Sequence, residues 1–238
     1  MGEYWTFRLH LDIFKVMLEG HDLEQGSINK REAKIMDIRS RELQRVILKD
    51  TRVIELLSEL NSHHHDTYLH SLRVGLLSID LGYEGQLNES KINVLGYAAH
   101  LHDIGKTKIG LNILDKKERL DEGERSEIKK HIRRGFVILT DFENEEIKMI
   151  VAQHHEYQPG SYPRTDLDRR KEDRDDERRS DNSDIDYLGE IIAISDMVDA
   201  LTSSRAYKEP LPIEEVEKIL RTEFLGDSSL IDRVLKRY

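Results

Sequence analysis

The segment LGYAAHLHDIGK, residues 95–106, constrains the chain most, because an apolar helical run delivers an imidazole and a carboxylate together at its end. Residues 94–101 form the run, His102 and Asp103 follow it, and Gly105 lets the chain turn. Neutral imidazole and ionised carboxylate suit borderline and harder divalent metals. Taken alone, the pair also fits a helix cap beside a surface histidine, so the remaining histidines decide between the two interpretations.

Further imidazoles and carboxylates recur on separate stretches of helical apolar periodicity. The inward-facing candidates for metal ligation are His70, His102, Asp103, His131, His154, His155 and Asp196, with Asp66 as an eighth. Asp66 precedes His70 by one helical turn, a spacing that fits either a shared metal or an ordinary helix-stabilising pair. Tandem histidines at the end of an apolar helix, and a carboxylate inside one, are costly to desolvate without a partner.

No alternating strand pattern competes with these helical stretches, so the sequence predicts an all-α fold in which several helices donate ligands to one centre. The number of candidates favours two or three metal ions. Residues 1–60 are expected to form a helical arm for packing or dimerisation, with helical segments over about 9–18 and 33–60. Residues 61–238 form the expected metal domain, with helices over 120–139, 147–155, 188–201 and 213–220 and a short helical tail over about 229–238.

Composition limits the classes of function. The chain has 238 residues, 37% of them hydrophobic and 35% charged, with a net charge of −10. Such an acidic balance argues against duplex nucleic acid as a partner, and no stretch approaches the roughly 18 apolar residues of a membrane span. The absence of cysteine excludes disulfides, thiolate ligands and cysteine nucleophiles. With no signal peptide evident, a cytoplasmic protein is expected.

Residues 164–186 differ sharply in composition, with only Leu167 and Ile185 as aliphatic residues among mixed charges. This pattern is typical of a mobile insertion or of a solvent-facing helix. A regulatory or partner-binding flap is the functional alternative.

The ordered motifs resemble the HD superfamily of metal-dependent phosphohydrolases, and within it the HD-GYP branch. The resemblance covers about residues 61–235. The matching pieces are His70-Ser71-x-Arg73-Val74, His102-Asp103-Ile104-Gly105-Lys106, His131 with Gly135, His154-His155-Glu156, and the stretch from Ile194 to Ser203 continued by Arg205, Tyr207 and Lys208.

The resemblance implies an HD-domain helical bundle with metal ligands at His70, His102, Asp103, His131, His154, His155 and Asp196. It implies that Asp103 bridges two metals and that Asp66 stands where some members hold a third. Lys106 would approach a substrate phosphate, and Arg205 and Lys208 would line the nucleotide site. The metals would be iron, manganese, nickel or zinc, and a water bridging two of them would attack phosphorus in line.

One loop departs from the family pattern. After His-His-Glu the family reads Asp-Gly-x-Gly-Tyr-Pro, whereas this chain reads Tyr157-Gln158-Pro159-Gly160-Ser161-Tyr162-Pro163. Three functions therefore stay open: a phosphodiesterase for a cyclic dinucleotide such as cyclic di-GMP, a phosphohydrolase for another nucleotide or phosphoester, and a non-catalytic cyclic-dinucleotide sensor. A small nucleotide substrate and a homodimer through the N-terminal helices are the expected partners.

Overall fold

The computed structural model describes residues 30–160, 162, 178–203 and 210–238, and these residues form helices and no strand. The α-helices are α2 (Lys30–Ile47), α3 (Thr51–His63), α4 (His65–Glu84), α5 (Glu89–Leu101), α6 (Leu111–Leu114), α7 (Glu122–Lys129), α8 (His131–Ile138), α9 (Glu145–Gln153), α10 (Arg178–Thr202), α11 (Ile213–Glu223) and α12 (Ser229–Leu235). Two short 3-10 helices, η1 (Ile104–Lys108) and η2 (Leu139–Asp141), connect them. The predicted all-α fold is confirmed.

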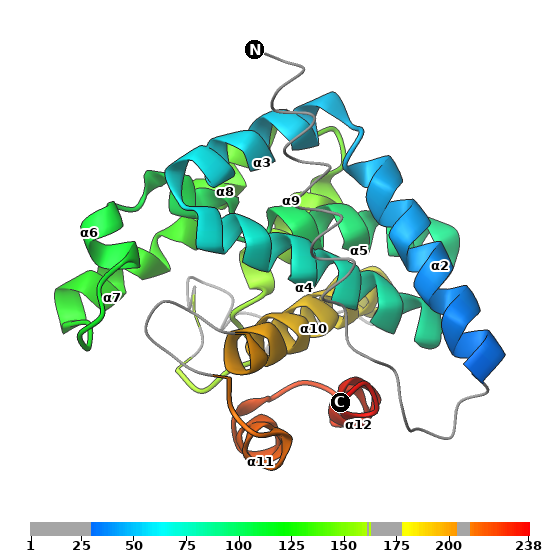
Figure 1. Ribbon diagram of the computed structural model, residues 1–238. Helices are drawn as coiled ribbons and strands as arrows, with labels where there is room; N and C mark the ends of the chain where they lie inside the picture. The colour runs from blue at the N-terminus through cyan, green and yellow to red at the C-terminus, as the bar shows by residue number, and fades with distance from the viewer. Residues whose placement is uncertain (1–29, 161, 163–177, 204–209) are drawn as a thin grey trace.

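Helix α4 is the centre of the bundle and packs against α2, α3, α5 and α10 (Figure 1). Small residues on α4 allow this close approach. A Cβ added at Gly75 would lie 2.3 Å from Cε1 of His100 on α5, so only glycine fits there. His100 is completely buried, and it donates from Nδ1 to the Gly96 carbonyl while Gln44 of α2 donates to its Nε2 at 3.0 Å. This polar contact fixes α2, α4 and α5 relative to one another.

The single helical segment expected over 33–60 is wrong, because the structure breaks it into α2 and α3. Asp50 caps α3: its Oδ1 accepts from the backbone nitrogens of Arg52 at 2.9 Å and Val53 at 3.4 Å. Its other oxygen accepts from the Tyr97 hydroxyl of α5 at 3.0 Å. The break therefore lets α3 turn across the bundle while Asp50 holds the corner to α5.

The described part of the N-terminal arm packs on the remainder of the bundle, since α2 and α3 both contact α4 and α5. Ile47, Val53 and Leu60 are fully buried there. Ile38 and Val46 of α2 stay exposed. The division at residue 60 and a homodimer through these helices stay predictions.

Two further boundaries differ from expectation. The helix predicted over 120–139 is two helices, α7 and α8, with Lys130 between them. The charged stretch 164–186 is not one insertion: residues 163–177 lie outside the described part of the chain, whereas 178–186 already belong to α10. Ile185 is buried, and the Asp186 carbonyl accepts from the Tyr157 hydroxyl at 2.8 Å. Asp184 is exposed, as the solvent-facing-helix interpretation expects, and Ile185 is the first residue of the stretch seen to face inward.

Among the described helices, none has both the length and the hydrophobicity needed to cross a bilayer.

Candidate metal centre

The structure brings the predicted ligand side chains of α4, α5, α8, α9 and α10 to one buried place. Three overlapping groups each have ligand atoms within 4.8 Å of one another. The groups are His131 with His154 and His155, His70 with His102 and Asp103, and His102 with His154 and Asp196. Seven of the eight candidates thus converge, from positions as far apart in sequence as residues 70 and 196.

Asp103 lies between two sets of imidazoles. Its Oδ2 lies 3.5 Å from Nε2 of His102 and 3.7 Å from Nε2 of His70, whereas its Oδ1 lies 3.4 Å from Nε2 of His131. One carboxylate oxygen therefore faces each set. This arrangement is what a carboxylate shared between two cations requires.

The close approach of η1 to α8 creates this juxtaposition. A Cβ at Gly105 would lie 1.9 Å from the carbonyl oxygen of His131 and 2.5 Å from the nitrogen of Gly135. Only glycine permits such backbone contact, so Gly105 sets the distance between Asp103 and His131. The sequence singled out Gly105 as a turn residue, and its packing role emerges only in three dimensions.

Three imidazoles are oriented by backbone carbonyls three residues earlier. The Nδ1 atoms of His102, His131 and His154 donate to the carbonyl oxygens of Ala99, Ile128 and Val151 at 2.8, 2.7 and 2.7 Å. Each Nε2 is then an unprotonated acceptor that points into the cluster. The Nε2 atoms of His131 and His154 lie 3.5 Å apart, so two lone pairs face one another.

His70 is oriented by a side chain instead. Its Nδ1 donates to Oδ2 of Asp199 at 2.6 Å, and its Nε2 lies 3.0 Å from Oδ1 of Asp196. Arg73 donates to both oxygens of Asp199, at 2.5 Å from Nε and 3.0 Å from Nη2. Asp199 also accepts from the Ser203 hydroxyl at 2.9 Å. Asp199 thus meets His70 and Arg73 across 129 and 126 positions of the chain, a pairing that the sequence did not reveal.

Burial controls the protonation of the cluster. Desolvation lowers the pKa of His131 and of His155 to about 3, and it lowers the pKa of His154 well below the usual value. Burial also opposes the charge of Asp103, but the neighbouring Lys106 ammonium and His102 outweigh it and hold the pKa of that carboxyl well below its usual range. At neutral pH these imidazoles are neutral and the carboxylate is ionised, the forms that ligate metals.

His70 and Asp196 form the charged corner. Burial would lower the pKa of His70, yet hydrogen bonds and charge from Asp196 and Asp199 outweigh it and raise that pKa. The pKa of Asp196 lies well below its usual value because contact with His70 overcomes its own desolvation. The Asp196 side chain is 14% exposed, whereas Asp103 is 1% exposed. The cluster is therefore deepest at Asp103 and more open near Asp196.

The donor set fits divalent cations. Nε2 of His102, Oδ1 of Asp103 and Nδ1 of His155 are buried and make no hydrogen bond within the described structure. Buried polar atoms without partners are costly, and a cation bound among them removes that cost. Imidazole nitrogens with carboxylate oxygens suit zinc, iron, manganese or nickel.

The remaining predicted site residues have different positions. Lys106 Nζ lies 2.6 Å from Oδ2 of Asp103, with its side chain 21% exposed, so the ammonium lies at the edge of the cluster. Asp66 is exposed, and none of the ligand groups found in the described residues includes it. Its expected role with a third metal is not supported by this position. Arg205 and Lys208 lie outside the described residues.

Tyr162 was not predicted as a site residue. Its ring stacks on His155 with centroids 4.7 Å apart, and Lys129 Nζ lies 4.8 Å from the centroid of the Tyr162 ring. Burial, with the charges of Asp103 and Asp196 nearby, raises the pKa of Tyr162, so the phenol stays protonated. The variant loop thus places an aromatic hydroxyl beside the cluster, a contact that no pattern in the sequence could reveal.

An all-helical bundle whose central His-Asp pair lies in a cluster of buried imidazoles and carboxylates is the architecture of the HD class. Residues 67–201 match the HD domain family, and the chain belongs to this family. The resemblance inferred from the motifs is thereby confirmed.

Curated relatives agree with this assignment. A 3′3′-cGAMP-specific phosphodiesterase 2 from Vibrio cholerae is 32% identical over 175 residues, covering 72% of this chain and 31% of that protein. A cyclic di-GMP phosphodiesterase from Thermotoga maritima is 34% identical over 168 residues, covering 68% of this chain and 42% of that protein. The chain thus aligns with less than half of the length of either relative.

A solved structure has the same fold. The HD domain of the L. monocytogenes phosphodiesterase PgpH, crystallised with cyclic-di-AMP, superposes with a TM-score of 0.51 at 22% identity, covering 76% of this chain and 92% of that one.

Proposed function

We propose that this protein is a metal-dependent phosphodiesterase that hydrolyses a cyclic dinucleotide such as cyclic di-GMP. The observation that carries the proposal is Asp103, whose two oxygens face separate sets of imidazoles within a buried cluster. The activities for which these two relatives are named support the substrate class, since one acts on cyclic di-GMP and the other on 3′3′-cGAMP.

His70, His102, Asp103, His131, His154, His155 and Asp196 would hold the cations. When bound, two divalent cations would lower the pKa of water and polarise the phosphate oxygens. No nucleophilic side chain is then required, which agrees with the lack of cysteine. The number of cations and the identity of the metal are part of the proposal, and two is the number that the geometry of Asp103 favours.

The chain's own residues would prepare the site. The backbone carbonyls behind His102, His131 and His154 keep each Nδ1 protonated and each Nε2 available. Lys106, at the edge of the cluster, can place its ammonium beside a phosphate oxygen and neutralise charge that develops there. Arg205 and Lys208 are proposed as further substrate contacts on the family resemblance alone.

The variant loop favours a second candidate, a phosphohydrolase of the same fold with a different nucleotide or phosphoester as substrate. Tyr162 occupies space beside His155, where its ring and its protonated hydroxyl would limit which substrate can approach. Pocket shape determines substrate choice more readily than it changes the chemistry.

The test uses purified chain loaded separately with Mn²⁺, Fe²⁺, Ni²⁺ and Zn²⁺ and assayed for metal content. The loaded protein is then incubated with cyclic di-GMP, 3′3′-cGAMP, cyclic-di-AMP and a set of mononucleotides. Turnover of a cyclic dinucleotide, absent in Asp103→Asn, supports the proposal. Turnover of mononucleotides alone favours the second candidate. Fully metallated protein that binds but hydrolyses nothing would be a sensor, and the proposed activity would be wrong.

A further inference from the structure

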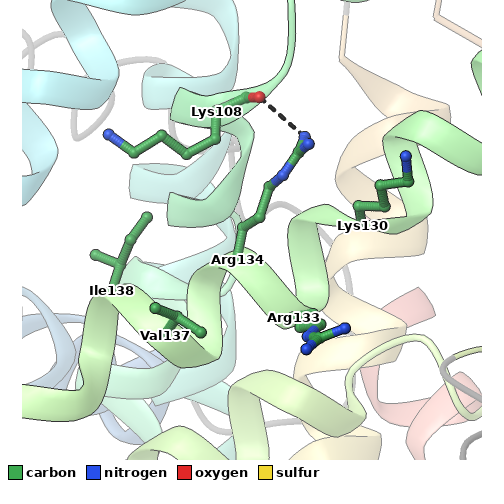
Figure 2. A pocket seen from close by; sticks show the side chains of 6 residues that line it. All are labelled: Lys108, Lys130, Arg133, Arg134, Val137 and Ile138. Carbon is green, nitrogen blue, oxygen red and sulfur yellow. Dashed lines mark hydrogen bonds between the residues drawn. The ribbon is translucent and has the colours of Figure 1, made fainter.

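An open pocket of about 450 Å³ lies along α8, and none of the predicted metal ligands lines it. Six residues line it: Lys108, Lys130, Arg133, Arg134, Val137 and Ile138. Figure 2 shows Val137 and Ile138 at one side, Lys130 and Arg133 at the other, and Arg134 between them. Nothing in the proposed catalysis uses these side chains.

The pocket is positively charged in an acidic protein. Lys108 pairs with Glu59 at 2.8 Å, and Glu127 contacts both Lys130 at 2.5 Å and Arg134 at 2.7 Å. Two carboxylates thus serve three cations, and within the described part of the chain Arg133 has no acidic partner. The whole chain has a net charge of −10, so this local excess of positive charge is opposite in sign to the charge of the chain as a whole.

The pocket combines two kinds of surface. Arg134 is held in place because its Nη1 donates to the Lys108 carbonyl at 2.9 Å (Figure 2). Beside the cations, Val137 is 63% exposed and the neighbouring Phe136 is 41% exposed. Arginine and lysine bind phosphate by charge-assisted hydrogen bonds, and an exposed apolar wall can accept a base or sugar. The volume lies within the range of small-ligand sites, about 300–1,000 Å³.

We propose that this pocket is a second ligand site, which binds the phosphate of a nucleoside monophosphate apart from the metal centre. The phosphate would contact Arg133 together with Lys130 and Arg134, and the nucleoside would lie against Val137 and Ile138. The inference goes beyond the proposed hydrolysis and does not depend on it.

A ligand here would be well placed to influence the metal centre. Lys130 directly precedes His131, and Arg134 joins α8 to Lys108 at the end of η1. These are the two segments whose backbone contact at Gly105 sets the distance between Asp103 and His131. A ligand bound in the pocket would therefore affect the contact between η1 and α8, which positions Asp103 and His131.

The test measures binding of GMP to chelator-treated protein by isothermal titration calorimetry at low ionic strength, with guanosine and inorganic phosphate as comparison ligands. GMP should bind, guanosine should not, and phosphate should bind more weakly. Added salt should weaken GMP binding, because the cations are exposed. Equal binding of guanosine, or no GMP binding at millimolar concentration, would overturn the proposal.

Variants locate the site. Arg133→Glu should weaken GMP binding by about tenfold or more, since it replaces an attractive charge by a repulsive one. The matched control Arg221→Glu alters an exposed arginine on α11 and should leave affinity unchanged. Asp103→Asn should retain binding, because the metal centre takes no part. Unchanged affinity in Arg133→Glu, or loss in Asp103→Asn, would contradict the assignment. Neither result depends on whether the protein hydrolyses a dinucleotide.

Discussion

Individual side chains determine whether the cluster can hold metal, and Asp103 has the largest expected effect. Asp103→Asn keeps the size of the side chain but removes the charge that faces both sets of imidazoles. We expect the variant to lose bound metal and activity while its helical circular dichroism stays near that of the parent. Metal content by plasma mass spectrometry measures the result.

The control for that variant is Asp66→Asn. Asp66 is exposed and outside every group of ligand atoms in the described structure, so its substitution should leave the metal content unchanged. A fall in metal content would instead restore the role expected from the sequence, a ligand to a further metal.

Asp199 should act through His70. Asp199→Asn weakens the acceptor for the His70 Nδ1 proton and the partner of Arg73. Changes of this kind behind a ligand typically cost about 10- to 100-fold in metal affinity. Competition with a chromophoric chelator measures the dissociation constant without reference to activity. Ser203→Ala removes a lesser contact to the same carboxylate and should change the affinity far less.

Seven residues that converge in the cluster were readable from the sequence as candidate ligands, because histidine and aspartate in apolar helical runs need partners. The contacts that orient those ligands were not readable. Asp199 and Arg73 meet across 126 positions of the chain, and Tyr162 reaches His155 from a loop with no periodic pattern. Such pairings depend on how helices pack, which the periodicity of one helix does not encode.

The helical type of these segments was predicted well, but the breaks between helices were not. Residues 33–60 and 120–139 each read as one helical stretch, since the apolar period continues past Asp50 and Lys130. The structure shows a break at both positions. At Asp50 the cap and the Tyr97 hydroxyl explain the break, and both depend on a contact with α5.

Asp50→Ala tests that explanation. The loss of the cap should lower the free energy of unfolding by about 1 kcal/mol, with an added cost because the Tyr97 hydroxyl loses its acceptor. Urea denaturation followed by circular dichroism gives the value. Tyr97→Phe removes only the second contact and should be the milder change; equal losses would mean that the cap itself contributes little.

The whole molecule should lose stability in mild acid when metal is removed. Buried His100, whose pKa is lowered to about 4 by desolvation, and His131, whose pKa is about 3, are neutral when folded but titrate near 6.5 when unfolded. The unfolded chain therefore binds more protons between about pH 6.5 and 4, so the free energy of unfolding falls as pH falls through that window. His70, with a raised pKa, acts in the opposite direction.

Unfolding of chelator-treated protein at several pH values measures this dependence. Each such buried histidine contributes a slope of about 1.4 kcal/mol per pH unit inside its window. His100→Gln should lower the slope by up to that amount, because His100 is buried, belongs to none of the ligand groups and contacts Gln44 and Gly96. An unchanged slope in this variant would show that His100 is not neutral in the folded protein.

The histidines of the cluster differ in how sensitive their orientation is to mutation of neighbouring residues. Three of its rings are aimed by main-chain oxygens of residues 99, 128 and 151, which nearly every amino acid supplies equally. Because Ala99 and Val151 are fully buried, exchanges that conserve side-chain volume can proceed there without turning the rings. The orientation of His70 depends instead on a side chain, so a single substitution of Asp199 removes the group that orients it. Descendants of this chain should thus accept conservative exchanges at residues 99, 128 and 151, and should lose function first when Asp199 changes.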